Sequence, residues 1–185
     1  MRKMITVTML ALTFMSVSAG KKVGGAQIPD SLAAGGEQLA LNGAGLRKKF
    51  VVKVYAGALF LKNKSGDAKT IINADESMAI RMHFLYGVKP DQLTDAFDEG
   101  FEAAGADKNN ADIKAFKAMF DTKTKKGDTY DIIYVPGKGI EVLFNGQSKG
   151  TVSGLDIKKA VFAIWLGDKI SDGNLKSLRK AMLGK

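Results

Sequence analysis

The spacing of hydrophobic residues predicts three strands in the first half of the chain. Residues 50–61 combine β-branched and aromatic side chains between two turn signals, which is typical of a long strand. Residues 37–45 predict a shorter strand that ends in a glycine hinge. Residues 77–85 alternate strictly, which places apolar side chains on one face and Arg81 and His83 on the other.

A helical pattern follows at residues 90–104, which begin with Pro90 and are followed by Gly105. Its apolar stripe is formed by Leu93, Phe97, Phe101 and Ala104. Other helices are expected at residues 67–75, 111–120, 156–168 and 171–183.

Three further strands are expected at residues 128–135, 139–145 and 147–154, and Asn145-Gly146 is a strong turn signal between the last two. Strands grouped around helices, without regular alternation, predict an α+β domain with a large antiparallel β-sheet and a helical layer on one face. We expect this domain to cover residues 36–185, after a turn-rich leader at residues 20–35.

The N-terminus has the pattern of a signal peptide. Arg2 and Lys3 precede an apolar run, and the small residues Val17 and Ala19 predict cleavage after Ala19. We therefore expect a periplasmic or secreted protein. The apolar run is shorter than a membrane span of about 20 residues, so no stable span is expected after processing; an uncleaved anchor is the alternative.

Composition narrows the classes of function. The 185 residues suit one domain with a real core, and the absence of cysteine excludes disulfides and thiolate chemistry. Loss of the two N-terminal cations lowers the formal charge from +9 to +7, which still favours an anionic ligand. The lysines are scattered without interleaved aromatic residues, so nucleic acid is not an expected partner. The sequence leaves the oligomeric state open.

Few residues could carry catalysis. His83 is the only histidine and stands in mid-strand, with no serine motif and no carboxylates at ligand-like spacing nearby. We expect a strand residue that faces solvent or an interface, with haem ligation as the alternative. No metal site and no cofactor other than haem is expected.

Arg47 and Tyr55 form the most suggestive pair. A guanidinium offers a planar fork that matches a carboxylate, and a phenol adds a neutral donor. Beside an apolar wall they could hold the head group of a fatty acid. The wall is expected to include Val51, Leu59, Met82 and Phe97. The alternative is that Arg47 begins a surface strand and Tyr55 only packs.

Four stretches together resemble the chalcone isomerase-like family in its bacterial branch. They are LNGAGLRKKFVVKVYAGALFL, MHFLYGVKPDQLTDAFDEGF, GDTYDIIYVPGKGIEVLFNG and AVFAIWLGD. The resemblance implies a ligand cleft between the sheet and the helices. In that family, chalcone isomerases act as intramolecular lyases on phenolic substrates, other members bind fatty acids without catalysis, and some bacterial members have features of haem or tetrapyrrole binders.

The resemblance assigns Arg47 to the arginine that the enzymes and the fatty-acid binders share. Tyr55 matches the tyrosine of the fatty-acid binders, where the enzymes have threonine. The catalytic tyrosine of the enzymes falls near Gln92 or Leu93, and their asparagine falls near Glu99 or Gly100. Because most of the enzymatic set is missing, the resemblance favours a non-catalytic binder of a small apolar anion over an isomerase.

A binding role makes one geometric demand. Arg47 and Tyr55 are eight residues apart, which is roughly 26 Å along a straight strand at about 3.3 Å per residue. They can meet at one carboxylate only if the chain reverses between them, and we expect that turn near Lys48 and Lys49. A structural or partner-binding protein without a cavity is the remaining alternative.

Overall fold

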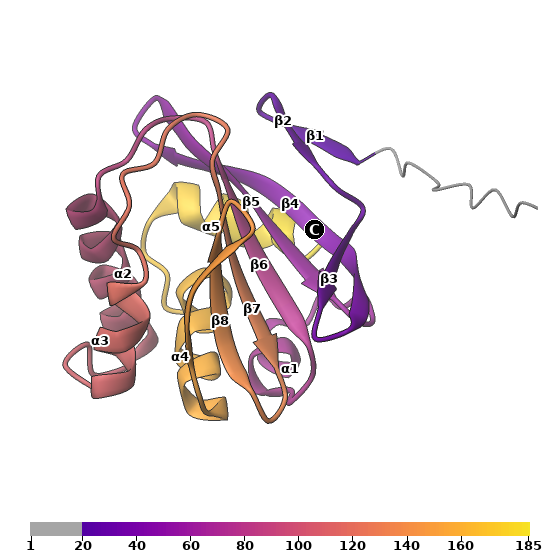
Figure 1. Cartoon of the computed structure of the whole chain (residues 1–185). Helices are drawn as coiled ribbons and strands as arrows, with labels where there is room; N and C mark the ends of the chain where they lie inside the picture. The colour runs from indigo at the N-terminus through magenta and orange to yellow at the C-terminus, as the bar shows by residue number, and fades with distance from the viewer. Residues whose placement is uncertain (1–19) are drawn as a thin grey trace, which may run out of the picture.

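A computed structural model describes residues 20–185, and the expected signal peptide lies outside these residues. The domain is built on a seven-stranded antiparallel sheet with helices on one face (Figure 1). The strands are β1 (Lys21–Val23), β2 (Ala26–Ile28), β3 (Ser31–Ala34), β4 (Glu37–Lys49), β5 (Val52–Leu61), β6 (Met78–Phe84), β7 (Thr129–Val135), β8 (Gly139–Phe144) and β9 (Gln147–Val152). The helices are α1 (Ala68–Asn73), α2 (Pro90–Ala104), α3 (Ala111–Ala118), α4 (Leu155–Leu166) and α5 (Gly173–Met182).

The order of the strands in the sheet follows their order in the sequence, from β3 to β9. Each strand therefore pairs with the next one along the chain, and every connection within the sheet joins antiparallel neighbours. The predicted α+β class and the predicted antiparallel sheet with a helical layer are confirmed. The turn at Asn145–Gly146 is confirmed as well, with both residues at positive φ, 49° and 80°.

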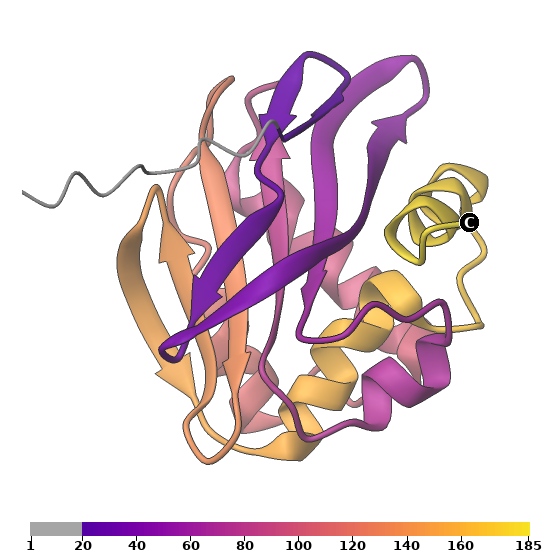
Figure 2. The ribbon, with the colours of Figure 1, turned by 90° about the vertical axis from the view of Figure 1, so that its right-hand side faces the viewer.

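The larger of two cores lies between the sheet and the helices (Figure 2). On β6, every second residue faces this core, as the alternation predicted. Aromatic residues supply much of its volume, because α2, α3, α4 and β7 all direct rings into it. Those rings are Phe97, Phe101, Phe116, Phe162, Trp165 and Tyr130.

A second, smaller core covers the other face of the sheet and involves the expected leader. The structure differs from the expected turn-rich segment, because β1 and β2 form a hairpin and β3 is an edge strand of the main sheet. Ile28 and Leu32 from this segment pack with small residues of the sheet, including Ala56 and Ala58. The sheet is thus buried on both faces in this region, and residues 21–34 are part of the folded domain.

The prediction of a glycine hinge at the end of the first strand is wrong. Strand β4 continues through Gly43 and Gly45 to Lys49. A Cβ atom at Gly43 would lie 2.2 Å from the carbonyl oxygen of Ala181, and one at Gly45 would lie 2.6 Å from the Ala181 Cβ. These glycines therefore make room for α5, which lies directly against the sheet.

The helices α2, α4 and α5 lie close to their expected ranges. Gly105 has φ 76° and ends α2, as predicted, while α3 is two residues shorter than expected. Among residues 20–185, no helix is both long and apolar enough to cross a membrane.

Candidate ligand-binding cavity

The β4–β5 hairpin brings Arg47 and Tyr55 directly opposite each other in the antiparallel register. Residues that face each other in this way project from the same face of a sheet. The predicted chain reversal is confirmed, but it lies at Phe50 and Val51, because the strands stay paired through Lys49. Although Arg47 and Tyr55 are eight residues apart in sequence, they are therefore direct neighbours on paired strands.

A β-bulge beside this pair changes which residues face the helices. Arg47 pairs with Tyr55 and Lys48 pairs with Lys53, so that Val54 is an extra residue on β5. Neighbouring residues of a regular strand point to opposite faces, but a bulge re-aims one of them. Val54 and Tyr55 consequently both line the same cavity.

This cavity has a volume of about 500 Å³ and lies between the hairpin end of the sheet, α2, and the segment that joins α4 to α5. Its volume falls within the range usual for small-molecule sites. Its apolar wall includes Val54, Met82, Leu93, Phe97, Ile164 and Trp165. Met82 and Phe97 are thus placed as expected. Val51 and Leu59 are not: Val51 is exposed at the hairpin turn and Leu59 is buried in the core.

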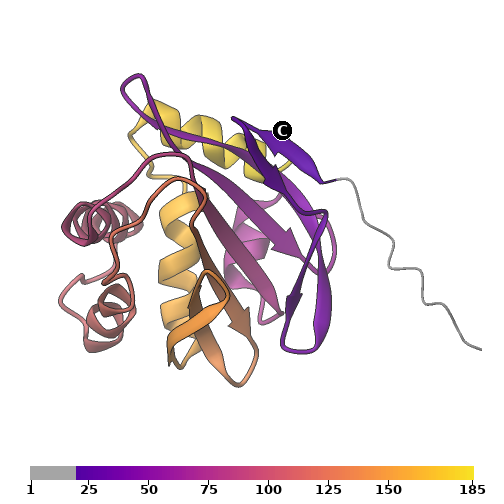
Figure 3. The same cartoon turned by 45° about the horizontal axis from the view of Figure 1, so that its top comes forward.

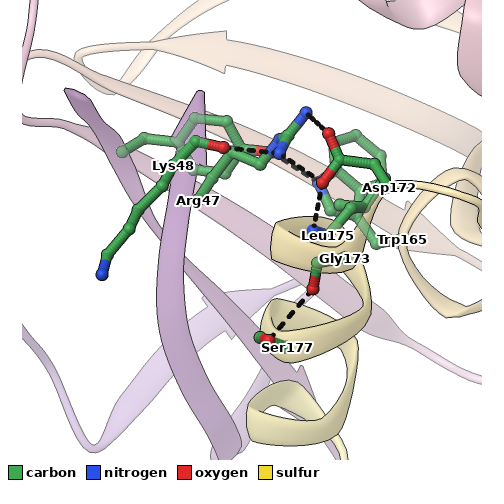
Figure 4. Close-up of polar contacts among 8 residues, drawn as sticks. Arg47, Lys48, Trp165, Asp172, Gly173, Leu175 and Ser177 are labelled. Carbon is green, nitrogen blue, oxygen red and sulfur yellow. Dashed lines mark hydrogen bonds and ion pairs between the residues drawn. The ribbon is translucent and has the colours of Figure 1, made fainter. Parts of the chain in front are cut away.

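Arg47 is held at the cavity by two acceptors (Figure 4). Its Nη1 donates to the Lys48 carbonyl at 2.6 Å and to Asp172 Oδ1 at 3.1 Å, and its Nη2 donates to Asp172 Oδ2 at 3.1 Å. A guanidinium carries five N–H donors, so the Nε–H and one Nη2–H have no partner among the described residues. Arg47 can therefore bind a further acceptor without losing Asp172.

Asp172 was not predicted as a site residue. Its side chain accepts from the Leu175 amide at 2.9 Å and caps the N-terminus of α5. Burial acts to raise the pKa of Asp172, but the Leu175 amide and the Arg47 guanidinium outweigh it, so the pKa lies below its ordinary value. The sequence around Asp172 showed a turn and a helix start, but no signal for a partner 125 residues away.

Tyr55 is buried, and its hydroxyl accepts a hydrogen bond from Trp165 Nε1 at 2.9 Å. Burial raises the pKa of Tyr55 above its ordinary value, so the phenol is neutral at physiological pH. Its own O–H has no acceptor among the described residues. Tyr55 can thus donate this proton to a ligand while Trp165 fixes the position of its oxygen.

His83 lies away from the cavity. It follows Met82 on β6, and Met82 lines the cavity, so His83 projects from the opposite face of the sheet. Partial burial and the charge of Arg81 lower the pKa of His83. Among residues 20–185, no group of three or more His, Asp or Glu side chains could hold a metal ion.

The positions that the resemblance gives to the tyrosine and asparagine of the enzymes do lie on the cavity wall. Gln92, Leu93, Glu99 and Gly100 all line it. A Cβ at Gly100 would lie 2.6 Å from the Ile164 Cγ2, so α2 and α4 approach too closely there for a larger residue. The wall therefore has no hydroxyl group at the position assigned to the tyrosine and no amide group at the position assigned to the asparagine.

Fold and site define an α+β domain with an apolar cavity at one end of a curled antiparallel sheet. The chain belongs to the chalcone isomerase-like family, whose model matches residues 20–184. Its fold is similar to that of a fatty-acid binding protein from Arabidopsis thaliana, AtFAP1, with a TM-score of 0.68 at 21% identity. That similarity covers 86% of this chain and 92% of the Arabidopsis chain. No curated protein sequence matches the chain.

Proposed function

We propose that this protein is an exported, non-catalytic carrier that holds a fatty acid or a similar apolar carboxylate in the cavity. The observation that supports this most directly is the placement of Arg47 opposite Tyr55 at a cavity with an apolar wall. The free donors of Arg47 and the free proton of Tyr55 would bind the carboxylate. The wall formed by α2, α4 and β6 would cover the tail.

The apolar tail and the carboxylate head of such a ligand would contribute different amounts to the free energy of binding. Each buried methylene contributes about 0.8 kcal/mol, so ten methylenes outweigh one charge-assisted contact of about 1.5–3 kcal/mol. The tail would therefore supply most of the affinity. The head contact would select for anions and fix the orientation of the ligand.

The family adds support to this proposal. The Arabidopsis protein with the similar fold is described as a fatty-acid binding protein. At the wall positions where the resemblance puts the catalytic tyrosine and asparagine of the isomerases, this chain has Gln92 or Leu93 and Glu99 or Gly100. A binder needs neither of the missing groups. The N-terminal sequence supports export, because a basic start and an apolar run precede small residues up to Ala19, after which cleavage is predicted.

A comparison of free fatty acids with their methyl esters tests the role of Arg47. Arg47→Gln combined with Asp172→Asn removes the guanidinium without leaving the Asp172 carboxylate unpaired. Compared with Asp172→Asn alone, the double variant should bind the free acid about 10- to 100-fold more weakly, which corresponds to one charge-assisted hydrogen bond. Binding of the methyl ester should change by less than about threefold, because the ester carries no charge.

Calorimetry with the free acid and with the methyl ester, for Asp172→Asn and for the double variant, measures this difference. Lys138→Gln, a change of an exposed residue in the β7–β8 turn, is the control for loss of a positive charge elsewhere. Equal losses for acid and ester would exclude Arg47 as the carboxylate-binding group. Native mass spectrometry of protein purified from its own host would identify the molecule that it carries.

A further inference from the structure

The tip of the β4–β5 hairpin carries a group of exposed hydrophobic side chains. Among residues 20–185, the exposed large hydrophobic residues are Phe50, Val51, Val52 and Tyr86, and we call this group the apolar tip. Phe50 is 86% exposed and Val51 is 93% exposed. Tyr86 lies beside the hairpin, because its amide donates to the Val54 carbonyl at 3.2 Å. Figure 3 shows the end of the hairpin projecting beyond the rest of the ribbon.

Local folding does not explain these side chains. A two-residue hairpin turn favours Asn, Asp or Gly, since one or both positions require positive φ. This protein follows that rule at Asn145–Gly146, but the β4–β5 turn holds Phe50 at φ 55° followed by Val51. A large aromatic residue in this conformation is strained and gains no burial. Its presence in the turn therefore indicates contact with something outside the chain.

The charges around the apolar tip indicate what that contact is. Residues 47–55 contain Arg47, Lys48, Lys49 and Lys53 and no acidic residue. Arg47 is paired with Asp172, but the three lysines are exposed and form no ion pair with a described residue. Exposed aromatic and aliphatic side chains beside unpaired lysines are typical of segments that bind the surface of anionic membranes.

We propose that the apolar tip inserts into the surface of a bilayer that contains anionic lipids, with Lys48, Lys49 and Lys53 against the head groups. This membrane binding depends only on the exposed side chains of the hairpin and not on the proposed carrier function. Phe50, Val52 and Tyr86 also line the cavity, so insertion brings its opening to the bilayer surface. If the cavity holds a fatty acid, as proposed above, the ligand can then pass between membrane and protein without crossing water.

Sedimentation with lipid vesicles tests the insertion. The protein is recovered after export, and the wild type and its variants carry the same N-terminus, so that they differ only at the substituted residues. Vesicles of phosphatidylcholine alone are compared with vesicles in which phosphatidylglycerol replaces part of it. The wild type should bind the anionic vesicles more tightly, and added salt should weaken this binding.

Two variants change exposed side chains of the β4–β5 hairpin at positions that do not line the cavity. Lys48→Gln with Lys53→Gln should weaken binding to anionic vesicles about 25-fold, at about fivefold for each lysine. Val51→Asp should weaken it at least as much, because it puts a carboxylate at the most exposed apolar position. Lys114→Gln with Lys138→Gln makes the same change in net charge on α3 and in the β7–β8 turn, and should have little effect.

Val51→Trp gives a second measurement. Trp165 is the only native tryptophan and is buried, so the added indole reports on the tip. Its emission should shift to the blue with anionic vesicles and stay unchanged with phosphatidylcholine alone. Vesicle binding that is equal for the wild type, Val51→Asp and the double lysine variant would overturn the proposal, and so would a Val51→Trp emission that vesicles leave unchanged.

Fatty-acid binding in solution separates this inference from the carrier function. Val51→Asp should bind free fatty acid as the wild type does, since Val51 does not line the cavity. A protein that binds fatty acid but no vesicles would overturn only the membrane contact. A protein that binds vesicles through its tip but no fatty acid would overturn only the carrier function.

Discussion

Replacing Asp172 by asparagine should strengthen the binding of a free fatty acid. Asp172 neutralises Arg47 through two contacts of 3.1 Å, so a bound carboxylate would share the guanidinium with a second negative charge. Asparagine removes that charge and keeps an oxygen that can cap α5, because Asn and Asp are about equally good at the N-cap. The helix and the cavity should therefore stay in place.

The size of the gain follows from the repulsion between the two carboxylates. At about 6 Å, two like charges repel by about 3 kcal/mol at an effective dielectric constant of about 20, and by about 1 kcal/mol at about 60. The side chain of Asp172 is 42% exposed and that of Arg47 is 18% exposed, so the site lies between these limits. We expect a gain of about 1–2 kcal/mol, which is about 5- to 30-fold in the dissociation constant.

Calorimetric titration with a free fatty acid and its methyl ester measures the effect at low and high salt. The gain should appear for the acid only and should shrink as salt screens the charges. Asp168→Asn, in the same connection between α4 and α5, is the matched control for removal of a negative charge. Unchanged or weaker binding of the acid by Asp172→Asn would refute the idea that ligand and Asp172 compete for Arg47.

Three further predictions concern single residues. Tyr55→Phe should weaken fatty-acid binding about 5- to 10-fold in the same titration, because it removes one donor, and it should lower the melting temperature by leaving the buried N–H of Trp165 unpaired; unchanged binding would exclude the phenol as a ligand contact. Gly43→Ala should destabilise the protein by about 2 kcal/mol or more in denaturant titration, because the added Cβ would lie 2.2 Å from a carbonyl oxygen. Gly173→Ala is the control and should be close to neutral, because the space around Gly173 is open. Burial lowers the pKa of Lys158 to about 8. Between about pH 8 and 10 the unfolded chain therefore binds a proton that the folded chain has released, so the free energy of unfolding should rise with pH. The Lys158→Met variant should not show this rise.

The sequence predicted those parts of the fold that depend on local pattern. The alternation on β6, the stripe and glycine stop of α2 and the turn at Asn145–Gly146 all depend on neighbouring residues, and the structure confirms them. Arg47 and Tyr55 could be paired in advance because their chemistry suits a carboxylate, the resemblance matched both positions, and strand geometry then required a turn between them.

What the sequence did not predict depends on contacts between distant segments. Gly43 and Gly45 suggested a hinge, because nothing near them in sequence indicates that a C-terminal helix packs against them. The partnership of Asp172 with Arg47 spans 125 residues and has no local pattern. The bulge at Val54 also depends on pairing with the neighbouring strand, so the cavity wall could not be assigned residue by residue.

The late position of α4 and α5 in the chain has a consequence for how the binding site is made. The sheet can grow strand by strand as the polypeptide emerges, but Trp165 and Asp172 reach Tyr55 and Arg47 only after nearly the whole chain is available. A chain truncated before α4 would contain every strand, with Arg47 and Tyr55, but would lack the Asp172 and Trp165 side chains that hold these two residues in place. Ligand occupancy would then report that the last helices have docked, and by mass action a bound molecule would hold them there.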